Sequence, residues 1–162
     1  MRKYQLLIAA AVLLLDRVTK LLVVARLPEA HSIVVIPGLF QFAHWENTGA
    51  AFSMFADSAS PWRTRGLIVF SILAIAVVAG LLWKSGSHLT ITTVALSLVL
   101  GGAGGNLWDR LTKGTVTDFL DFYIGDHHWP PFNVADSAIV VGAILLILTI
   151  LAPSSRSARR EH

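Results

Sequence analysis

Two aspartates near the ends of apolar segments are spaced so that they can meet in this 162-residue chain. Asp118 and Asp136 stand on either side of a 17-residue loop, whose two ends can return to the same surface. Two carboxyl groups about 3 Å apart do not both ionise easily, so one keeps a proton while the other stays charged. The charged group can take a proton from water while the protonated group polarises a carbonyl. One hypothesis from this spacing is therefore hydrolysis of an amide without a nucleophilic side chain.

Further polar residues lie close to the same apolar ends. Asn106, Asp109 and Arg110 are three and four positions apart, so they share one face if a helix continues that far. Asp109 and Arg110 can instead form a structural ion pair, because a buried arginine requires a carboxylate. Asp16 can pair with Lys20 across one helical turn without a role in chemistry, and Asn106 can simply cap a helix. The residues alone leave these alternatives open.

The remaining polar residues have simpler interpretations. Asn133 precedes an apolar segment and has the residue type and position of a helix N-cap. Asp121 and Asp126 are expected to be solvated loop residues. The adjacent His127 and His128 make a poor chelating pair without further ligands, so a surface loop is favoured over a metal site.

The composition indicates a membrane protein. Hydrophobic residues make up 54% of the chain and charged residues only 14%, with a mean hydropathy of +0.65, whereas soluble domains carry about 25% charged residues. The chain has no cysteine, which excludes thiol catalysis, disulfides and cysteine-ligated metals. The net charge of +3 comes without a basic patch interleaved with aromatics, so nucleic-acid binding is not expected.

Four apolar stretches are long enough for membrane-spanning helices, which need about 20 residues. They cover approximately residues 4–24, 67–83, 89–105 and 134–152. Within the first stretch, the apolar run 6–15 ends in Asp16 and Arg17 without a small-residue cleavage site, so we expect a retained anchor rather than a cleaved signal peptide. Four glycines between residues 101 and 105 have the spacing of closely packed membrane helices.

The charged and turn-forming residues predict the arrangement around these spans. Basic residues flank the spans in very short segments, including the tail, which places both termini in the cytoplasm and the two longer loops outside. The first outer segment, about residues 27–56, contains two short strands at 32–36 and 39–45 around Pro37 and Gly38. Residues 49–55 predict a short interfacial helix or loop, and residues 106–133 a second outer loop. The fold class is thus mainly α, with one domain at 1–152 and a disordered basic tail at 153–162.

Five motifs, in order along the chain, resemble those of one enzyme family. They are DRVTK at residues 16–20, NTGAAF at 47–52, GGAGGNLWDR at 101–110, VTDF at 116–119 and FNVADS at 132–137. Together with four apolar spans they resemble the lipoprotein signal peptidases (signal peptidase II). The resemblance covers essentially the whole chain except the basic tail, and the ordered set is far more specific than any single motif.

The resemblance implies an aspartic endopeptidase that removes signal peptides from diacylglyceryl-modified prolipoproteins. It would cut before the lipid-modified cysteine, at the outer face of the inner membrane, with residues 32–45 forming a periplasmic cradle. The implied catalytic residues are Asp118 and Asp136; the substrate site would be formed by Asn47, Gly49, Asn106, Arg110, Asn133 and Ala135, supported by Asp16, Lys20 and Asp109. The implied partners are prolipoprotein, membrane lipid and globomycin-type inhibitors, without nucleic acid, metal or other cofactor, and we expect a monomer.

Two other classes of function remain open from the residues themselves. Asp16, Asp109 and Asp136 could form part of a proton or cation path in a small transporter subunit. However, the polar groups lie at one surface, and the second and third spans are uncharged, so no crossing path is visible. A lipid head-group transferase with Asp118 and Asp121 as magnesium ligands is the other alternative.

Overall fold

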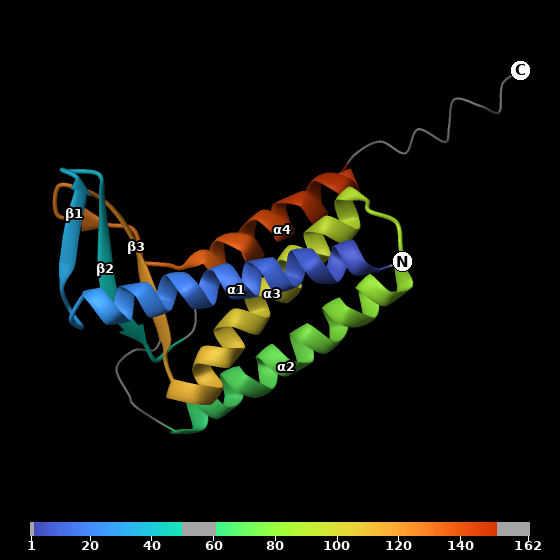
Figure 1. Cartoon of the computed structure of the whole chain (residues 1–162), viewed down its shortest axis with the longest axis horizontal. Coiled ribbons are helices and arrows are strands. Elements are labelled where there is room, and N and C mark those ends of the chain that lie inside the picture. Colours follow the sequence, from blue (N-terminus) through green and yellow to red (C-terminus); the bar gives the residue numbers. More distant parts are fainter. Residues whose placement is uncertain (1, 50–60, 152–162) are drawn as a thin grey trace, which may run out of the picture.

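The computed structural model describes residues 2–49 and 61–151. This part contains the helices α1 (Lys3–Arg26), α2 (Pro61–Lys84), α3 (Ile91–Lys113) and α4 (Val134–Leu151). It also contains the strands β1 (Ser32–Ile36), β2 (Phe40–Asn47), β3 (Val116–Ile124) and β4 (His127–His128). The helices lie side by side, and the sheet lies at one end of them (Figure 1).

The helix α3 is longer than the sequence predicts. It begins with a capping box, in which Thr90 accepts a hydrogen bond from the backbone of Thr93 and Thr93 accepts one in return. It passes the predicted end at residue 105, because residues 106–113 contain neither glycine nor proline. It ends at Gly114, whose φ of 81° lies in the left-handed region that glycine adopts readily. The added two turns bring part of the predicted outer loop onto the helix, so the prediction of a loop from residue 106 is wrong.

Glycines allow α3 to approach both of its neighbours in the core. A Cβ atom on Gly101 would lie 2.5 Å from the carbonyl oxygen of Ala9 in α1. A Cβ atom on Gly102 would lie 2.4 Å from the carbonyl oxygen of Ala135 in α4. No side chain fits at these distances, so the predicted close packing through small residues is confirmed.

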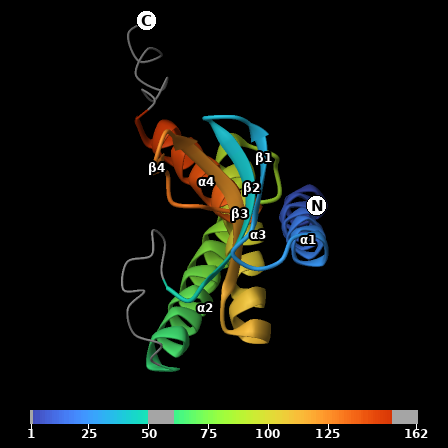
Figure 2. The same ribbon diagram turned by 90° about the vertical axis from the view of Figure 1, so that its left-hand side faces the viewer.

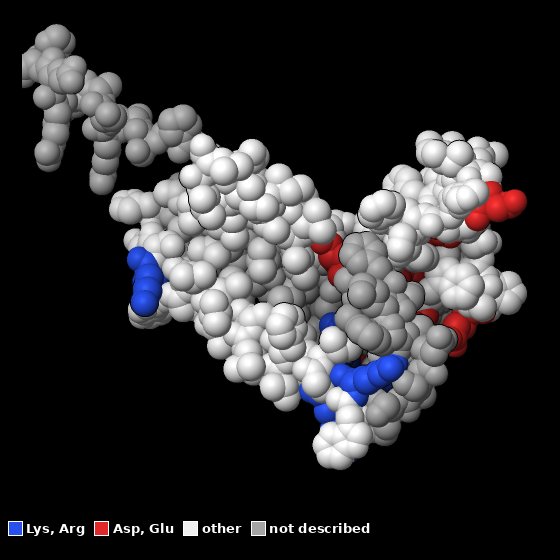
Figure 3. All heavy atoms as spheres, turned by 180° about the vertical axis from the view of Figure 1, so that it is seen from behind, with Lys and Arg blue, Asp and Glu red and all other residues white. Residues whose placement is uncertain are grey.

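Much of the helical surface is apolar and exposed. The helices α2, α3 and α4 are each long and apolar enough to cross a membrane. The helix α1 has 24 residues but includes Asp16, Arg17 and Lys20; of these, Asp16 and Lys20 are fully buried. On the face shown in Figure 3, charged atoms lie towards the ends of the helical body and the surface between them is white. Three helices of the described part thus qualify as membrane spans, and α1 matches them in length.

The strands form one antiparallel sheet in the order β1-β2-β3-β4 (Figure 2). The hairpin of β1 and β2 confirms the two strands predicted in the first outer segment. By contrast, β3 lies where the sequence predicts a loop, and that prediction is wrong. Its β-branched and aromatic residues pair with β2, with Asp118 opposite Trp45. This pairing fixes the position of Asp118 at the ends of the helices.

Two predicted features fall outside the described residues. They are the interfacial helix or loop of residues 49–55, apart from Gly49, and the basic tail at 153–162. The division into one domain at 1–152 and a tail stays a prediction.

Candidate active site

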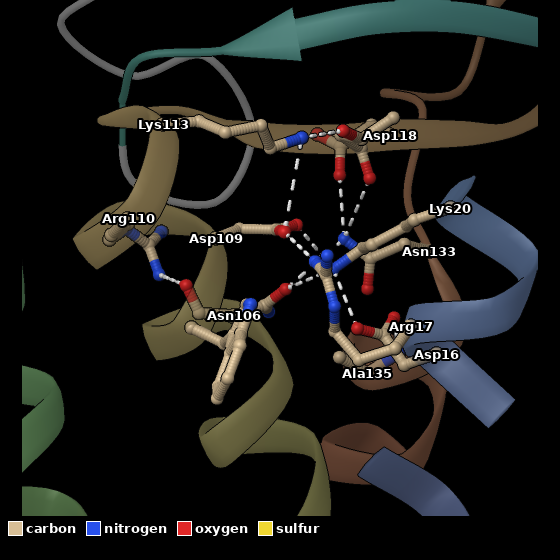
Figure 4. A network of polar contacts seen from close by, with 12 residues as sticks. Asp16, Arg17, Lys20, Asn106, Asp109, Arg110, Lys113, Asp118, Asn133 and Ala135 are labelled. Atoms are coloured by element: carbon tan, nitrogen blue, oxygen red, sulfur yellow. Dashed lines mark hydrogen bonds and ion pairs between the residues drawn. The ribbon is translucent and has the colours of Figure 1, made fainter. Parts of the chain in front are cut away.

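Polar residues from five elements meet where the sheet lies against the helix ends, and most of them are drawn in Figure 4. Asp16 and Lys20 come from α1, Asn106, Asp109 and Arg110 from α3, Asp118 from β3, Asn133, Ala135 and Asp136 from the start of α4, and Asn47 and Gly49 from the end of β2. The structure therefore brings all of the predicted site residues together. Their individual roles stay predictions.

The carboxyl group of Asp118 is held by two side-chain amides. Its Oδ2 accepts a hydrogen bond of 2.9 Å from Nδ2 of Asn47, and its Oδ1 accepts one of 2.8 Å from Nδ2 of Asn133. The residue is only 4% exposed. Because β3 pairs with β2, and Asn133 immediately precedes α4, the position of this carboxyl group depends on both the sheet and the helices.

Asp136 occupies the third position of α4 and takes part in a reciprocal cap. Its backbone N–H donates to Oδ1 of Asn133 at 2.9 Å, and its Oδ2 accepts from the backbone N–H of Asn133 at 3.3 Å. The N-cap predicted at Asn133 is thus confirmed. The other oxygen, Oδ1, accepts a hydrogen bond of 2.8 Å from Nδ2 of Asn106. Asn106 itself lies inside α3, so its prediction as a helix cap is wrong.

Asn133 connects the two carboxyl groups, donating from its side chain to Asp118 and from its backbone to Asp136. Burial raises the pKa of Asp118 to about 7, and the negative charge of Asp136 acts in the same direction. Hydrogen bonds from Asn47 and Asn133 and the charge of Lys20 oppose this rise. A carboxyl group with such a pKa can both donate and accept a proton near neutral pH.

A compact ionic network lies next to these two residues. The Nζ atom of Lys20 lies 2.8 Å from Oδ2 of Asp16 and 3.0 Å from Oδ2 of Asp109. Arg17 forms a further ion pair with Asp109. The side chains of Asp16, Lys20 and Asp109 are at most 1% exposed. The predicted pair of Asp16 with Lys20 is confirmed, and a buried cluster of this kind requires both signs of charge.

Asp16 also fixes the start of α4. Its Oδ1 accepts a hydrogen bond of 3.0 Å from the backbone N–H of Ala135. A Cβ atom on Gly105 would lie 2.6 Å from its Oδ2, so glycine leaves the room that this carboxylate occupies. The contact joins α1 to the first turn of α4, one residue before Asp136.

Arg110 is not the main partner of Asp109, which pairs with Arg17, Lys20 and, at 3.8 Å, Lys113. Asp109 thus lies in an ion-pair network, as one alternative expected, but its pairs are with other cations, and Arg110 interacts with it only electrostatically. The guanidinium of Arg110 lies 3.5 Å from the carbonyl oxygen of Gly49 and interacts electrostatically with both carboxyl groups of the pair.

Sequence reasoning misses a second cluster, around Glu46 on β2. Glu46 accepts hydrogen bonds from Thr115 and Thr117 and pairs with Lys113 at 3.4 Å. Burial alone would raise the pKa of Glu46, but these hydrogen bonds and the charge of Lys113 hold the pKa below its usual range. The β-branched and aromatic residues of VTDFLDFYI could have indicated a strand, but only its pairing with β2 places Thr117 opposite Glu46.

Asp121 is a clear correction to the sequence prediction. It is only 2% exposed rather than solvated, and it accepts hydrogen bonds from Gln41 at 2.7 Å and from His128 at 2.9 Å. The pairing of β3 with β2 buries it. Asp126 is exposed on a turn, as expected, whereas His127 and His128 are exposed but form the strand β4 rather than a loop. Within residues 2–49 and 61–151, no group of three potential ligands lies close enough to hold a metal ion.

Comparisons with known proteins agree with this site. The family described as signal peptidase (SPase) II matches residues 8–152. A lipoprotein signal peptidase of Solibacter usitatus (strain Ellin6076) is 46% identical over 151 residues, which are 93% of this chain and 92% of that protein. One from Sulfurihydrogenibium sp. (strain YO3AOP1) is 44% identical over 141 residues, 86% of each chain.

A solved structure is also similar along nearly the whole length. It is described as a bacterial membrane enzyme determined by the in meso method at 2.3 Å resolution. The TM-score is 0.85 with 30% identity, and the similarity covers 99% of this chain and 94% of that one. The fold is thus that of a membrane enzyme with two carboxyl groups at the ends of its helices. The chain belongs to the signal peptidase II family. It is a peptidase, and the transporter interpretation has no support.

Proposed function

We propose that this protein is an aspartic endopeptidase that removes the signal peptide of diacylglyceryl-modified prolipoproteins, cutting before the lipid-modified cysteine. The observation that carries the proposal is the pair of Asp118 and Asp136, which share Asn133 as a hydrogen-bond donor. Relatives that are 44% and 46% identical are named lipoprotein signal peptidases, which supports the same class of substrate.

The proposed reaction needs one proton on the pair. The raised pKa of Asp118 makes it the protonated member, and it donates a hydrogen bond to the scissile carbonyl. Asp136 takes a proton from water as the water oxygen attacks the carbonyl carbon. Asp118 then protonates the carbonyl oxygen, which gives a tetrahedral diol. When the C–N bond breaks, the amine takes the proton from Asp136, and one diol hydroxyl returns its proton to Asp118.

The neighbouring residues are suited to hold the substrate against this pair. Asn47, Asn106 and Asn133 orient the two carboxyl groups through neutral N–H donors. Arg110 and Gly49 lie beside them and offer a guanidinium and a backbone segment for the peptide. Positioning of this kind accounts for a large share of enzymatic rate enhancement.

We further propose that all four helices span the inner membrane, with both termini in the cytoplasm and the site at the periplasmic end. The burial of Asp16 and Lys20 supports this for α1, because paired and buried charges are tolerated within a bilayer. A substrate anchored by its lipid would then reach the site by diffusion in the same membrane, which raises its effective concentration. We expect a monomer that is inhibited by globomycin-type peptides.

The deciding experiment measures cleavage of a diacylglyceryl-modified prolipoprotein by the purified protein in detergent, with a chelator present. Wild type, Asp136→Asn and the control Asp126→Asn are compared. Asp126 is an exposed carboxyl group on the turn between β3 and β4, so the control makes the same chemical change away from the site.

We expect cleavage by the wild type and by Asp126→Asn, and none by Asp136→Asn. Full activity of folded Asp136→Asn would contradict the aspartic mechanism. Loss of wild-type activity in the chelator would point to a metal-dependent reaction instead. Equal cleavage of a prolipoprotein without the diacylglyceryl group would show that the lipid is not part of the recognised substrate.

A further inference from the structure

The buried lysine of the ionic network has one contact that charge neutralisation does not require. An ammonium group has three N–H donors, and the Nζ atom of Lys20 has three oxygen neighbours. Two are the carboxylates of Asp16 and Asp109, at 2.8 and 3.0 Å. The third is Oδ1 of Asn106, which accepts a hydrogen bond of 3.0 Å. Lys20 therefore links the network directly to an amide that contacts Asp136.

This contact determines how the amide of Asn106 is oriented. Its Oδ1 accepts hydrogen bonds from Lys20 and, at 3.3 Å, from Nδ2 of Asn133. Its Nδ2 then faces the other way and donates to Oδ1 of Asp136 at 2.8 Å. A flipped amide would place its NH₂ group against the ammonium, which has no acceptor. It would also place its oxygen against the carboxyl oxygen of Asp136.

Asn106 also contacts the amide that serves the second carboxyl group. Nδ2 of Asn133 donates to Oδ1 of Asn106, to Oδ1 of Asp118 and to the carbonyl oxygen of Thr117, at 3.3, 2.8 and 3.4 Å. Oδ1 of Asn133 accepts from the backbone N–H of Asp136, so the cap of α4 and Thr117 orient this amide independently of Lys20. The buried ammonium thus sets the direction of the amide of Asn106, whose N–H group donates to Asp136.

We propose that Lys20 is a positioning residue for the reaction: by holding Oδ1 of Asn106, its ammonium directs the N–H group of Asn106 onto Asp136. The proposal rests on the proposed function of the two aspartates as the catalytic pair. Lys20 takes no part in bond making, because its Nζ atom is buried between the carboxylates of Asp16 and Asp109 and the amide oxygen of Asn106.

Arg17 provides the matched control. It is a cation in the same network, three residues earlier on α1, and it pairs with Asp109. The guanidinium of Arg17 also lies over the ring of Trp108, and it makes no hydrogen bond to Asn106 or Asn133. Loss of Arg17 therefore removes the same charge and a buried ion pair but leaves the amide of Asn106 in place. A purely structural role of the network predicts similar effects for both cations.

The test is a double-mutant cycle on kcat, with the full-length protein in detergent and a diacylglyceryl-modified prolipoprotein. We expect Lys20→Met to lower kcat by about 10²-fold and to leave KM nearly unchanged, because a catalytic group that is misplaced by about 1 Å causes a rate loss of this size. Combined with Asn106→Ala, Lys20→Met should change kcat by less than about threefold beyond Asn106→Ala alone, since both act through one amide. Arg17→Met should lower the thermal midpoint but leave kcat of the folded enzyme within about threefold of wild type.

The proposal would be overturned if the kcat losses of Lys20→Met and Asn106→Ala multiplied in the double mutant. Equal kcat losses in Lys20→Met and Arg17→Met would also overturn it. Because Lys20→Met leaves Asp16 and Asp109 short of positive charge, the cycle is repeated in an Asp16→Asn background. There the charge is balanced, and the amide oxygen can still accept from Ala135. Asp136→Asn is measured alongside. If this variant retains activity, the assignment of the catalytic pair is wrong. If it is inactive while Lys20→Met keeps the wild-type kcat, only the positioning role of Lys20 is refuted.

Discussion

Two pairs of carboxyl groups lie side by side in this protein, and their partners differ. In the first pair, Asp16 and Asp109 contact the charged groups of Lys20 and Arg17. A neighbouring cation stabilises the ionised form of a carboxyl group, and removal of one partner leaves a buried charge without compensation. These ion pairs therefore hold α1 against α3 through Asp109, and they pair Asp16 with Lys20 within α1.

The second pair has neutral partners. Asp118 and Asp136 accept hydrogen bonds from the amides of Asn47, Asn106 and Asn133. Within residues 2–49 and 61–151, neither forms an ion pair with a lysine or arginine. Neutral donors fix the geometry of a carboxyl group while allowing it to exist with or without its proton. The contrast shows how one cluster of acids can divide between holding the helices together and moving protons.

The largest effect on activity is expected from Asp118→Asn. Cleavage should fall by at least about 10⁴-fold, because the catalytic pair acts as a unit. The free energy of unfolding should change by less than about 1 kcal/mol, because the substitution also removes a carboxyl group that burial disfavours in its charged form. Prolipoprotein cleavage and thermal unfolding in detergent measure the two quantities. Strong destabilisation would show that Asp118 belongs to the structural group instead.

Asp109→Asn is expected to show the opposite pattern. The substitution leaves Lys20 and Arg17 without a shared carboxylate, and breaking a buried pair costs about 3–5 kcal/mol. Unfolding in mixed detergent micelles measures the loss, with the exposed Asp126→Asn as the control. The activity of each folded molecule should fall far less than in Asp118→Asn. A stability equal to that of wild type would remove the distinction between the two pairs.

The pH dependence of cleavage sharpens the same comparison. The pKa of Asp118 is raised from 3.8 to about 7, so its catalytic proton is lost and kcat/KM falls as pH rises through about 7. For the same reason, the contribution of this group to stability is fully present below pH 3.8 and is lost as pH rises through about 7. Asn47→Ala removes a hydrogen bond that lowers the pKa of Asp118, so the alkaline limb should move to higher pH by about one unit. If the alkaline limb of the kcat/KM profile did not move in Asn47→Ala, the loss of activity at high pH would belong to a group other than Asp118.

Much of this site follows from the sequence because its parts lie on long apolar segments. The helical spacing of Asn106 and Asp109, the pairing of Asp16 with Lys20 and the cap at Asn133 are all local relations that a helix enforces. The glycines near residue 101 likewise predict close packing from composition alone.

Features that depend on strand pairing do not follow in this way. The second outer loop contains β3, whose residues pair with residues of β2 that lie 69 to 82 positions earlier in the chain. Only this pairing buries Asp121 and places Thr117 beside Glu46. The partner of Asp109 is also misjudged, because the adjacent Arg110 is on its own helix whereas Arg17 approaches from α1. Interactions between distant segments require the register and packing that one sequence pattern does not contain.

The smallest effect is expected from Asp121→Asn, a buried acid that belongs to neither pair. Its hydrogen bonds go to Gln41 and His128 on the sheet, and an asparagine retains one acceptor oxygen for them. We expect a loss of about 1 kcal/mol in the free energy of unfolding, the size of one hydrogen bond. Cleavage should stay within about twofold of wild type, because additivity holds for residues without shared partners. A large loss of cleavage at unchanged stability would show that the outer part of the sheet contacts the substrate. The acidic residues that take part in function would then extend beyond Asp118 along β3.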